Sequence, residues 1–171
     1  RPAGAPPSAG IARPRATVLS CRPVDAEAKL AFAALADLLE PVAARMVPLL
    51  AEPQRVALEV ALLHASPQGA LPSPRVVAAA VLSVLRLLAT DGPLVIAIDD
   101  EQWVDRASAD ALAFALRRIG NLPVGLVTSV RVGDGDAPDP LGLDVAFGER
   151  LERRALGPLT PGALHHVVRQ Q

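Results

Sequence analysis

The sequence is poor in cysteine, in aromatic residues and in long apolar runs. Cys21 is the only cysteine in 171 residues, which excludes an internal disulfide framework and is compatible with a reducing cytosol. Aromatic residues make up 2% of the chain, so alanine, leucine and valine must build its core. No segment approaches the ~18 unbroken apolar residues of a membrane span, and the N-terminus lacks the features of a signal peptide. We therefore expect a cytoplasmic protein with no membrane partner.

Lysine is nearly absent as well, and this bears on nucleotide binding. A phosphate-binding loop follows the pattern G-x-x-x-x-G-K-[ST], because its backbone N–H groups cradle the phosphates while the lysine and hydroxyl reach the phosphates and Mg²⁺. The one lysine, Lys29, has no glycine near it, and none of the 12 glycines begins this pattern. A formal net charge of −1 also argues against a nucleic-acid surface, which usually carries a basic stripe.

The chain does contain an apolar strand that ends in two acids. Five consecutive apolar residues, 94–98, precede Asp99 and Asp100, as expected for a strand buried on both faces of a parallel sheet. Ligands of open α/β sheets bind at the carboxyl ends of strands. An acid pair at this place is typical of a Walker B motif, in which the first acid holds Mg²⁺ and the second polarises a water. Trp103 and Asp105 follow at spacings that sharpen this interpretation.

The pattern of elements predicts a three-layer α/β fold with a short parallel sheet. Strands are expected at 17–21, 94–99 and 124–130, adjacent and parallel, with 94–99 in the middle. We expect three regions in the chain: a Pro-rich disordered leader (1–15), the partial domain (16–158) and the start of a helical lid (159–171).

Helix signals fill the spaces between these strands. Asp25 is a plausible N-cap for a helix broken near Pro41 and Pro48, and Pro53 opens a second helix that lasts to about His64. Ser73 and Pro74 start a third, buried helix. The remaining expected elements are a helix capped by Asp105 and ended by Gly120, a last strand at 152–156, and a final helix from Pro161.

Several segments, in order, resemble the ATPase module of large bacterial LuxR-family regulators, which belong to the STAND branch of the AAA+-like NTPases. They cover nearly all of the chain from Val18 onward. The matching segments are 18–23, 30–39, 53–58, the acid-tipped strand with Trp103 and Asp105, 113–118 and 157–160. In this family the P-loop strand lies between the strand that ends near Val130 and the last strand. The resemblance therefore implies a P-loop-NTPase-like sheet without its first strand and P-loop, in which strand 124–130 and the last strand both lack a neighbour. Such an unpaired strand invites association.

The resemblance implies roles for individual residues. Asp99 would orient Mg²⁺, Asp100 would polarise the attacking water, and Arg131 would be the sensor that reads the γ-phosphate of Mg·ATP. The ordinary alternatives are that the acids are a solvated strand cap, that Asp105 is only a helix N-cap, and that Arg131 is a surface residue. Neither the aspartates of 134–139 nor the adjacent His165 and His166 match a metal-binding pattern.

Three functions remain open from the sequence. The first is a portion of an ATP-binding signalling module that retains Walker B, is inactive alone, and has the rest of its regulator or another protein as partner. The second is a protein-interaction domain on a degenerate NTPase scaffold, which would present its apolar sheet edge or its helices to a partner. With an open sheet edge, such a domain would self-associate or capture a partner. The third is an active Mg²⁺-dependent nucleoside triphosphatase that uses Asp99 and Asp100. The family's DNA-binding helix-turn-helix is not in this sequence, so we expect no direct binding to nucleic acid.

Overall fold

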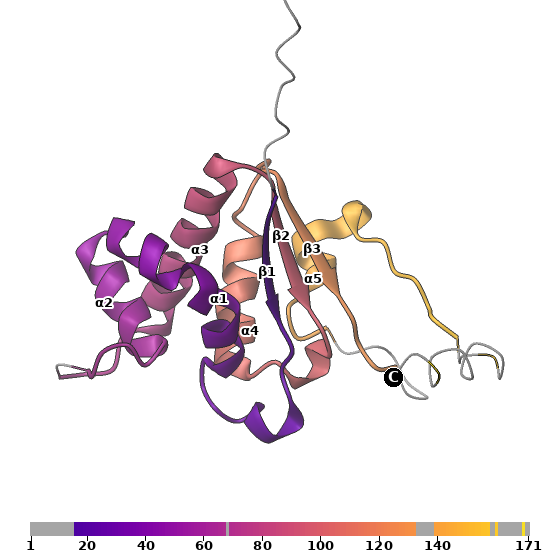
Figure 1. Cartoon of the computed structure of the whole chain (residues 1–171), viewed down its shortest axis with the longest axis horizontal. Coiled ribbons are helices and arrows are strands. Elements are labelled where there is room, and N and C mark those ends of the chain that lie inside the picture. Colours follow the sequence, from indigo (N-terminus) through magenta and orange to yellow (C-terminus); the bar gives the residue numbers. More distant parts are fainter. Residues whose placement is uncertain (1–15, 68, 133–138, 158–159, 161–168, 170–171) are drawn as a thin grey trace, which may run out of the picture.

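The computed structural model describes residues 16–67, 69–132, 139–157, 160 and 169, and its centre is a parallel sheet (Figure 1). Within these residues the sheet has three strands, in the order β1 (Thr17–Cys21), β2 (Leu94–Ile98) and β3 (Val124–Thr128). In this register Ile96 of β2 lies between Leu19 of β1 and Leu126 of β3. The predicted α/β class, the parallel pairing and the central position of the acid-tipped strand are confirmed.

The helices are distributed unevenly over the two faces of the sheet. In the described residues the α-helices are α1 (Ala33–Met46), α2 (Glu52–Ala61), α3 (Pro74–Asp91), α4 (Arg106–Leu116) and α5 (Leu143–Phe147). Helices α1, α3 and α4 lie on one side of the sheet, and α2 packs on α3 farther from it (Figure 1). The short α5 packs against α4 and lies to the right of the sheet in Figure 1. The 3-10 turns are η1 (Asp25–Glu27), η2 (Val47–Leu49), η3 (Glu101–Trp103) and η4 (Gly148–Arg150). No helix in the described part of the chain combines the length and apolarity needed to cross a membrane.

The core lies between the sheet and helices α1, α3 and α4. Leu19 and Ile96 are fully buried on this side, together with most of the apolar residues of α3. Because side chains alternate along a strand, their neighbours point to the other face. There Val18 is 60% exposed and Val127 is 63% exposed. The described residues therefore leave the second face of the sheet largely uncovered.

The prediction of a helix that begins at Asp25 is wrong. Residues 25–27 form only the 3-10 turn η1, and α1 begins at Ala33 after Phe32, whose φ of 65° ends the preceding turn. The predicted break at Pro41 is also wrong, because α1 continues through it to Met46. Proline removes the N–H that would bond the carbonyl of Asp37, and both residues are exposed, so water can satisfy that carbonyl.

The predicted last strand at 152–156 is wrong too. Residues 151–157 contain no helix or strand, and all but Leu151 are exposed. A strand needs a neighbour to bond with, and the described residues provide none at this place. Other boundaries move by a few residues: α2 ends at Ala61, α4 ends at Leu116 and β3 ends at Thr128. The predicted leader, the start of the helix at Pro161 and most of the acidic loop lie outside the described residues.

Candidate functional site

The two acids lie where the ends of all three strands meet. Asp99 follows β2 directly, and its backbone N–H donates to the carbonyl of Cys21 at the end of β1, at 3.1 Å. The N–H of Ser129, just after β3, donates to the carbonyl of Ile98 at 3.0 Å. The N–H of Glu101 in turn donates to the carbonyl of Ser129, at 2.8 Å. Hydrogen bonds that continue the sheet therefore bring residues from three distant segments to one edge.

Asp99 has an exposed carboxylate with two neighbours. The hydroxyl of Ser129 donates to its Oδ1 at 2.5 Å, and the Nε of Arg22 lies 3.2 Å from its Oδ2. The side chain of Asp99 is 53% exposed, so a cation from solvent can reach it. Arg22 comes directly after β1 and was not singled out by sequence reasoning, because an arginine after a strand is an ordinary surface feature.

Asp100 is the more enclosed of the two acids. Its backbone is left-handed, with φ 59° and ψ 49°, a conformation that non-glycine residues adopt rarely and that concentrates at functional sites. The Nε of Arg131 donates to its Oδ1 at 2.9 Å, and the Nε2 of Gln102 donates to the same oxygen at 2.9 Å. These hydrogen bonds, that from Arg131 first, hold the pKa of Asp100 below its ordinary value.

The donor set of this edge fits a magnesium ion in part. Mg²⁺ prefers carboxylate, hydroxyl and water oxygens, and Asp99, Asp100 and Ser129 provide such oxygens side by side. Among the described residues, however, no group of three or more histidines, cysteines or acids could hold a metal by itself. A bound Mg²⁺ would therefore need further oxygens from water or from phosphate. The sequence does not contain the G-x-x-x-x-G-K-[ST] pattern of a phosphate-binding loop.

Asp105 is a structural residue in this geometry. It is 2% exposed, and its Oδ1 accepts from the N–H of Ser108 at 2.9 Å, which caps α4 as predicted. The same carboxylate also accepts from the N–H groups of Phe32 and Ala34, at 2.9 and 3.1 Å. Asp105 therefore caps two helices, α1 and α4. The hydroxyl of Ser108 extends this cap, because it accepts from the N–H of Leu35 at 2.9 Å.

The remaining singled-out residues do not join the acids in a catalytic cluster. Trp103 is half-buried and is the last residue of η3, just after the acids. His64 pairs with Glu40 at 2.8 Å, an exposed contact at the end of α2. His165 and His166 lie outside the described residues. Cys21 is half-buried, and burial, with a smaller effect of the charge on Asp37, raises the pKa of its thiol to about 12.

Glu101 is a candidate residue that sequence reasoning missed. It is 2% exposed, and its Oε1 has no hydrogen-bond partner among the described residues. Burial raises the pKa of this carboxyl group above its ordinary value. A buried carboxylate oxygen without a partner is costly and calls for an explanation. No sequence signal could have found it, because a glutamate after an acid pair is unremarkable.

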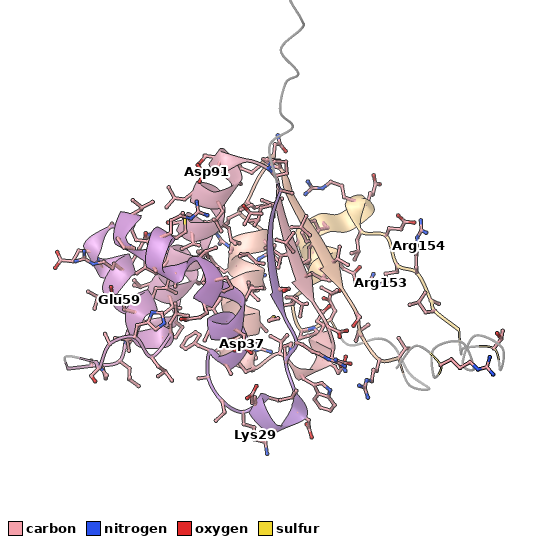
Figure 2. The ribbon with its side chains drawn as sticks, viewed as in Figure 1. Lys29, Asp37, Glu59, Asp91, Arg153 and Arg154 are labelled. Atoms are coloured by element: carbon pink, nitrogen blue, oxygen red, sulfur yellow. The ribbon has the colours of Figure 1, made fainter. Side chains whose placement is uncertain are left out.

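Glu101 faces a groove that runs beside β3. The groove encloses about 670 Å³ and is lined on one side by residues 128–132 and on the other by residues 151–156. Figure 2 shows Arg153 and Arg154 on this second wall, away from the sheet. Arg153 links residues 151–156 to α5, because its two terminal nitrogens donate to the carboxylate of Asp144 at 2.6 and 3.0 Å. We name this space the β3 groove.

Comparison with known proteins gives one match. A family model described as the AAA ATPase domain matches residues 9–127, which include β1, β2, the acid pair and nearly all of β3. No curated protein and no solved structure matches the chain. A three-stranded parallel sheet flanked by helices is consistent with part of a P-loop NTPase fold.

Proposed function

The chain belongs to the AAA ATPase domain family, and from this premise we propose that it is the part of an ATP-binding signalling module, in a LuxR-type transcriptional regulator, that carries the Walker B acids. Members of this family typically bind Mg·ATP. The observation that carries the proposal is the meeting of Asp99, Asp100 and Ser129 at the carboxyl ends of β2 and β3. Open parallel sheets bind their ligands at this edge.

The proposal gives different tasks to the two acids. Asp99 would hold Mg²⁺, since its carboxylate is exposed and has a hydroxyl oxygen beside it. Asp100 would polarise a water and Arg131 would bind the γ-phosphate. A guanidinium binds phosphate as well as carboxylate. An arriving phosphate would therefore draw Arg131 away from Asp100, and Asp100 would be free to accept a hydrogen bond from water.

The phosphate cradle has to come from residues other than these 171, because the sequence contains no P-loop. The β3 groove is a suitable place for the strand that would carry this cradle. A strand in this groove would lie between β3 and residues 151–156, would complete the pairing of β3, and would bring donors close to Oε1 of Glu101. Without that element, we expect the chain to bind Mg·ATP weakly and to have little or no hydrolysis of its own.

A second function, that of a protein-interaction domain, is favoured by the uncovered side of the sheet. Val18 and Val127 are exposed on this face, and the outer edge of β3 has no strand partner among the described residues. An unpaired edge with apolar neighbours is a template for another chain. In this alternative the acid pair would be a remnant of the scaffold.

The experiment that tests this proposal adds a phosphate-binding loop to the chain. A strand–P-loop–helix segment from another AAA ATPase domain is joined by a glycine–serine linker ahead of residue 16, and binding of a fluorescent ATP analogue is measured with Mg²⁺. The matched control carries alanine in place of the P-loop lysine. We expect micromolar binding by the joined protein, and loss of binding in the control and in Asp99→Asn.

Two results would count against the proposal. One is a joined protein that folds, as judged by circular dichroism, but binds no nucleotide. The other is binding that is unchanged by Asp99→Asn. If light scattering shows that the chain alone forms dimers, and Val127→Lys disperses them, the interaction domain becomes the better account.

A further inference from the structure

A second groove lies on the helical side of the sheet. It encloses about 830 Å³ between residues 28–31, the first turns of α3 and the length of α4. Small residues form much of its surface. Ala78 and Ala111 are buried at its floor, and Ala28, Ala31 and Ala107 lie on its walls. A surface of small side chains lets another backbone approach closely.

The rim of this groove is basic. Four cationic side chains line it, those of Lys29, Arg75, Arg106 and Arg117, and Figure 2 shows Lys29 at the tip of its segment. We name this space the basic groove. Three of the four, Lys29, Arg75 and Arg117, form no ion pair within the described part of the chain. The fourth, Arg106, pairs with Asp110 at 3.0 Å.

The two acids of the basic groove do not neutralise it. The carboxylate of Asp105 already accepts three backbone N–H groups, and that of Asp110 is engaged by Arg106. Four positive and two negative side chains therefore leave an excess of two positive charges. A ligand for such a surface carries negative charge.

The distance between the cations favours a peptide over a small anion as the ligand of the basic groove. Arg106 and Arg117 are eleven residues apart on and just beyond α4, which corresponds to ~16 Å at 1.5 Å per helical residue. One carboxylate or phosphate group would contact both only if the two side chains were extended toward each other along the helix. An extended peptide covers this distance with about five residues at ~3.3 Å each. The half-buried ring of Phe114, under the guanidinium of Arg118 at 3.8 Å, adds an apolar wall.

We infer that the basic groove binds an acidic peptide segment of a partner protein, with carboxylates spread over about five residues and apolar side chains between them. The carboxylates would lie against the four cations of the rim, Arg106 included, and the apolar side chains would lie against the alanines. This inference is independent of the nucleotide proposal, because the basic groove includes neither Asp99 nor Asp100 nor any residue of β3.

The probe is a fluorescein-labelled hexapeptide of alternating glutamate and leucine, and its binding to the full 171-residue chain is followed by fluorescence anisotropy at low salt. We expect the charge-reversed double variant Arg75→Glu/Arg117→Glu to weaken binding at least tenfold. The matched control is Arg55→Glu/Arg154→Glu, which makes the same change of net charge outside the groove and should bind as the unmodified chain does. Raising the salt concentration should weaken binding, since the attraction is between charges.

A second measurement keeps the inference testable if the double variant does not fold. In NMR spectra of the unmodified chain, the unlabelled peptide should shift the amides of Ala107 and Ala111 and leave those of β3 unchanged. Equal binding by the double variant and its control would overturn the inference. So would equal binding of a hexapeptide of alternating serine and leucine, or of a single-stranded oligonucleotide of matched charge.

Discussion

The guanidinium of Arg131 spans both carboxylate oxygens of Asp100, with Nε 2.9 Å from Oδ1 and Nη2 3.4 Å from Oδ2. The backbone N–H of Arg131 also donates to Oε1 of Gln102, whose amide bonds Asp100 in turn. Arg131 therefore lies beside the acids although it follows β3 by three residues. The same contact favours the ionised form of Asp100. It also engages both carboxylate oxygens until another anion competes for Arg131.

Arg131→Ala should raise the pKa of Asp100. The folded-state pKa of this carboxyl group is lowered, chiefly by the hydrogen bond from Arg131, so its contribution to stability is present above the unfolded value of ~3.9 and is lost as the pH falls through the lower folded value. Carbon-detected NMR titration of Asp100 should show the upward shift in Arg131→Ala. Arg45→Ala, which breaks an exposed ion pair with Asp91, is the control and should leave the titration of Asp100 unchanged.

Arg22→Ala should strengthen the binding of a divalent cation at Asp99. Arg22 lies 3.2 Å from Asp99 and 3.7 Å from Asp100, where it competes with a metal for the same oxygens. Exposed ion pairs contribute up to about 1 kcal/mol, so the gain should be at most about fivefold. Mn²⁺ binding, measured by electron paramagnetic resonance, is compared with that of Arg45→Ala, which removes the same charge elsewhere. Equal affinities of the two variants would show that Arg22 does not compete for this site.

Asp105→Ala should destabilise the fold whether or not nucleotide is present. The substitution removes the cap of α4, which is usually worth about 1 kcal/mol, and leaves the N–H groups of Phe32 and Ala34 without their acceptor. We expect a loss of about 3 kcal/mol, or a Tm lower by about 6–12 °C for a chain of this size. Thermal melts should show almost no change for Asp110→Ala, whose carboxylate is exposed. A Tm of Asp105→Ala within 2 °C of the unmodified chain would contradict the double cap.

The unbroken apolar run at 94–98 predicted β2 and its central place in the sheet correctly. Its expected burial on both faces was wrong, because Val95 and Ala97 are only partly buried on the face that the described helices leave open. The cap of α4 by Asp105 was local and could be predicted as well. The start of α1 could not, since its N–H groups are satisfied by Asp105 and Ser108, more than 70 residues away in the sequence. The predicted helix start at Asp25 was wrong for the same reason. The carboxylate that accepts from the first N–H groups of α1 lies in a distant segment of the chain.

The residues of the candidate site divide in the same way, into those that the sequence could predict and those that only the fold identifies. Asp99 and Asp100 were visible as acids at a strand end, whereas Arg22 and Glu101 became candidates only through their contacts and burial in the fold. The expected strand at 152–156 failed because pairing depends on a neighbour that no local pattern provides. The assignments of Asp99, Asp100 and Arg131 to magnesium, water and phosphate remain predictions.

The thiol of Cys21 should be slow to react in the folded chain. Its pKa is raised from 9.0 to about 12, first by burial and then by the charge on Asp37, so the thiolate fraction at pH 8 is about a thousandfold lower than in the unfolded chain. Stability from the protonated thiol is fully present below pH 9 and declines as the pH rises toward 12. Alkylation by iodoacetamide should be at least a hundredfold slower in buffer than in denaturant. Similar rates in the two conditions would show that Cys21 is accessible and ionised.

The most direct test of the account is a thermal melt of this 171-residue chain with and without 1 mM Mg·ATP. Asp99 and Asp100 are anionic and repel phosphates unless Mg²⁺ lies between them, and the sequence contains no G-x-x-x-x-G-K-[ST] pattern to bind the phosphates. A Kd of ~1 mM corresponds to about −4 kcal/mol and would stabilise the chain by only about 0.4 kcal/mol at this concentration. The account predicts a Tm increase of at most about 1–2 °C. An increase of several degrees that disappears in Asp99→Ala would contradict it, because the chain would then bind nucleotide without a P-loop.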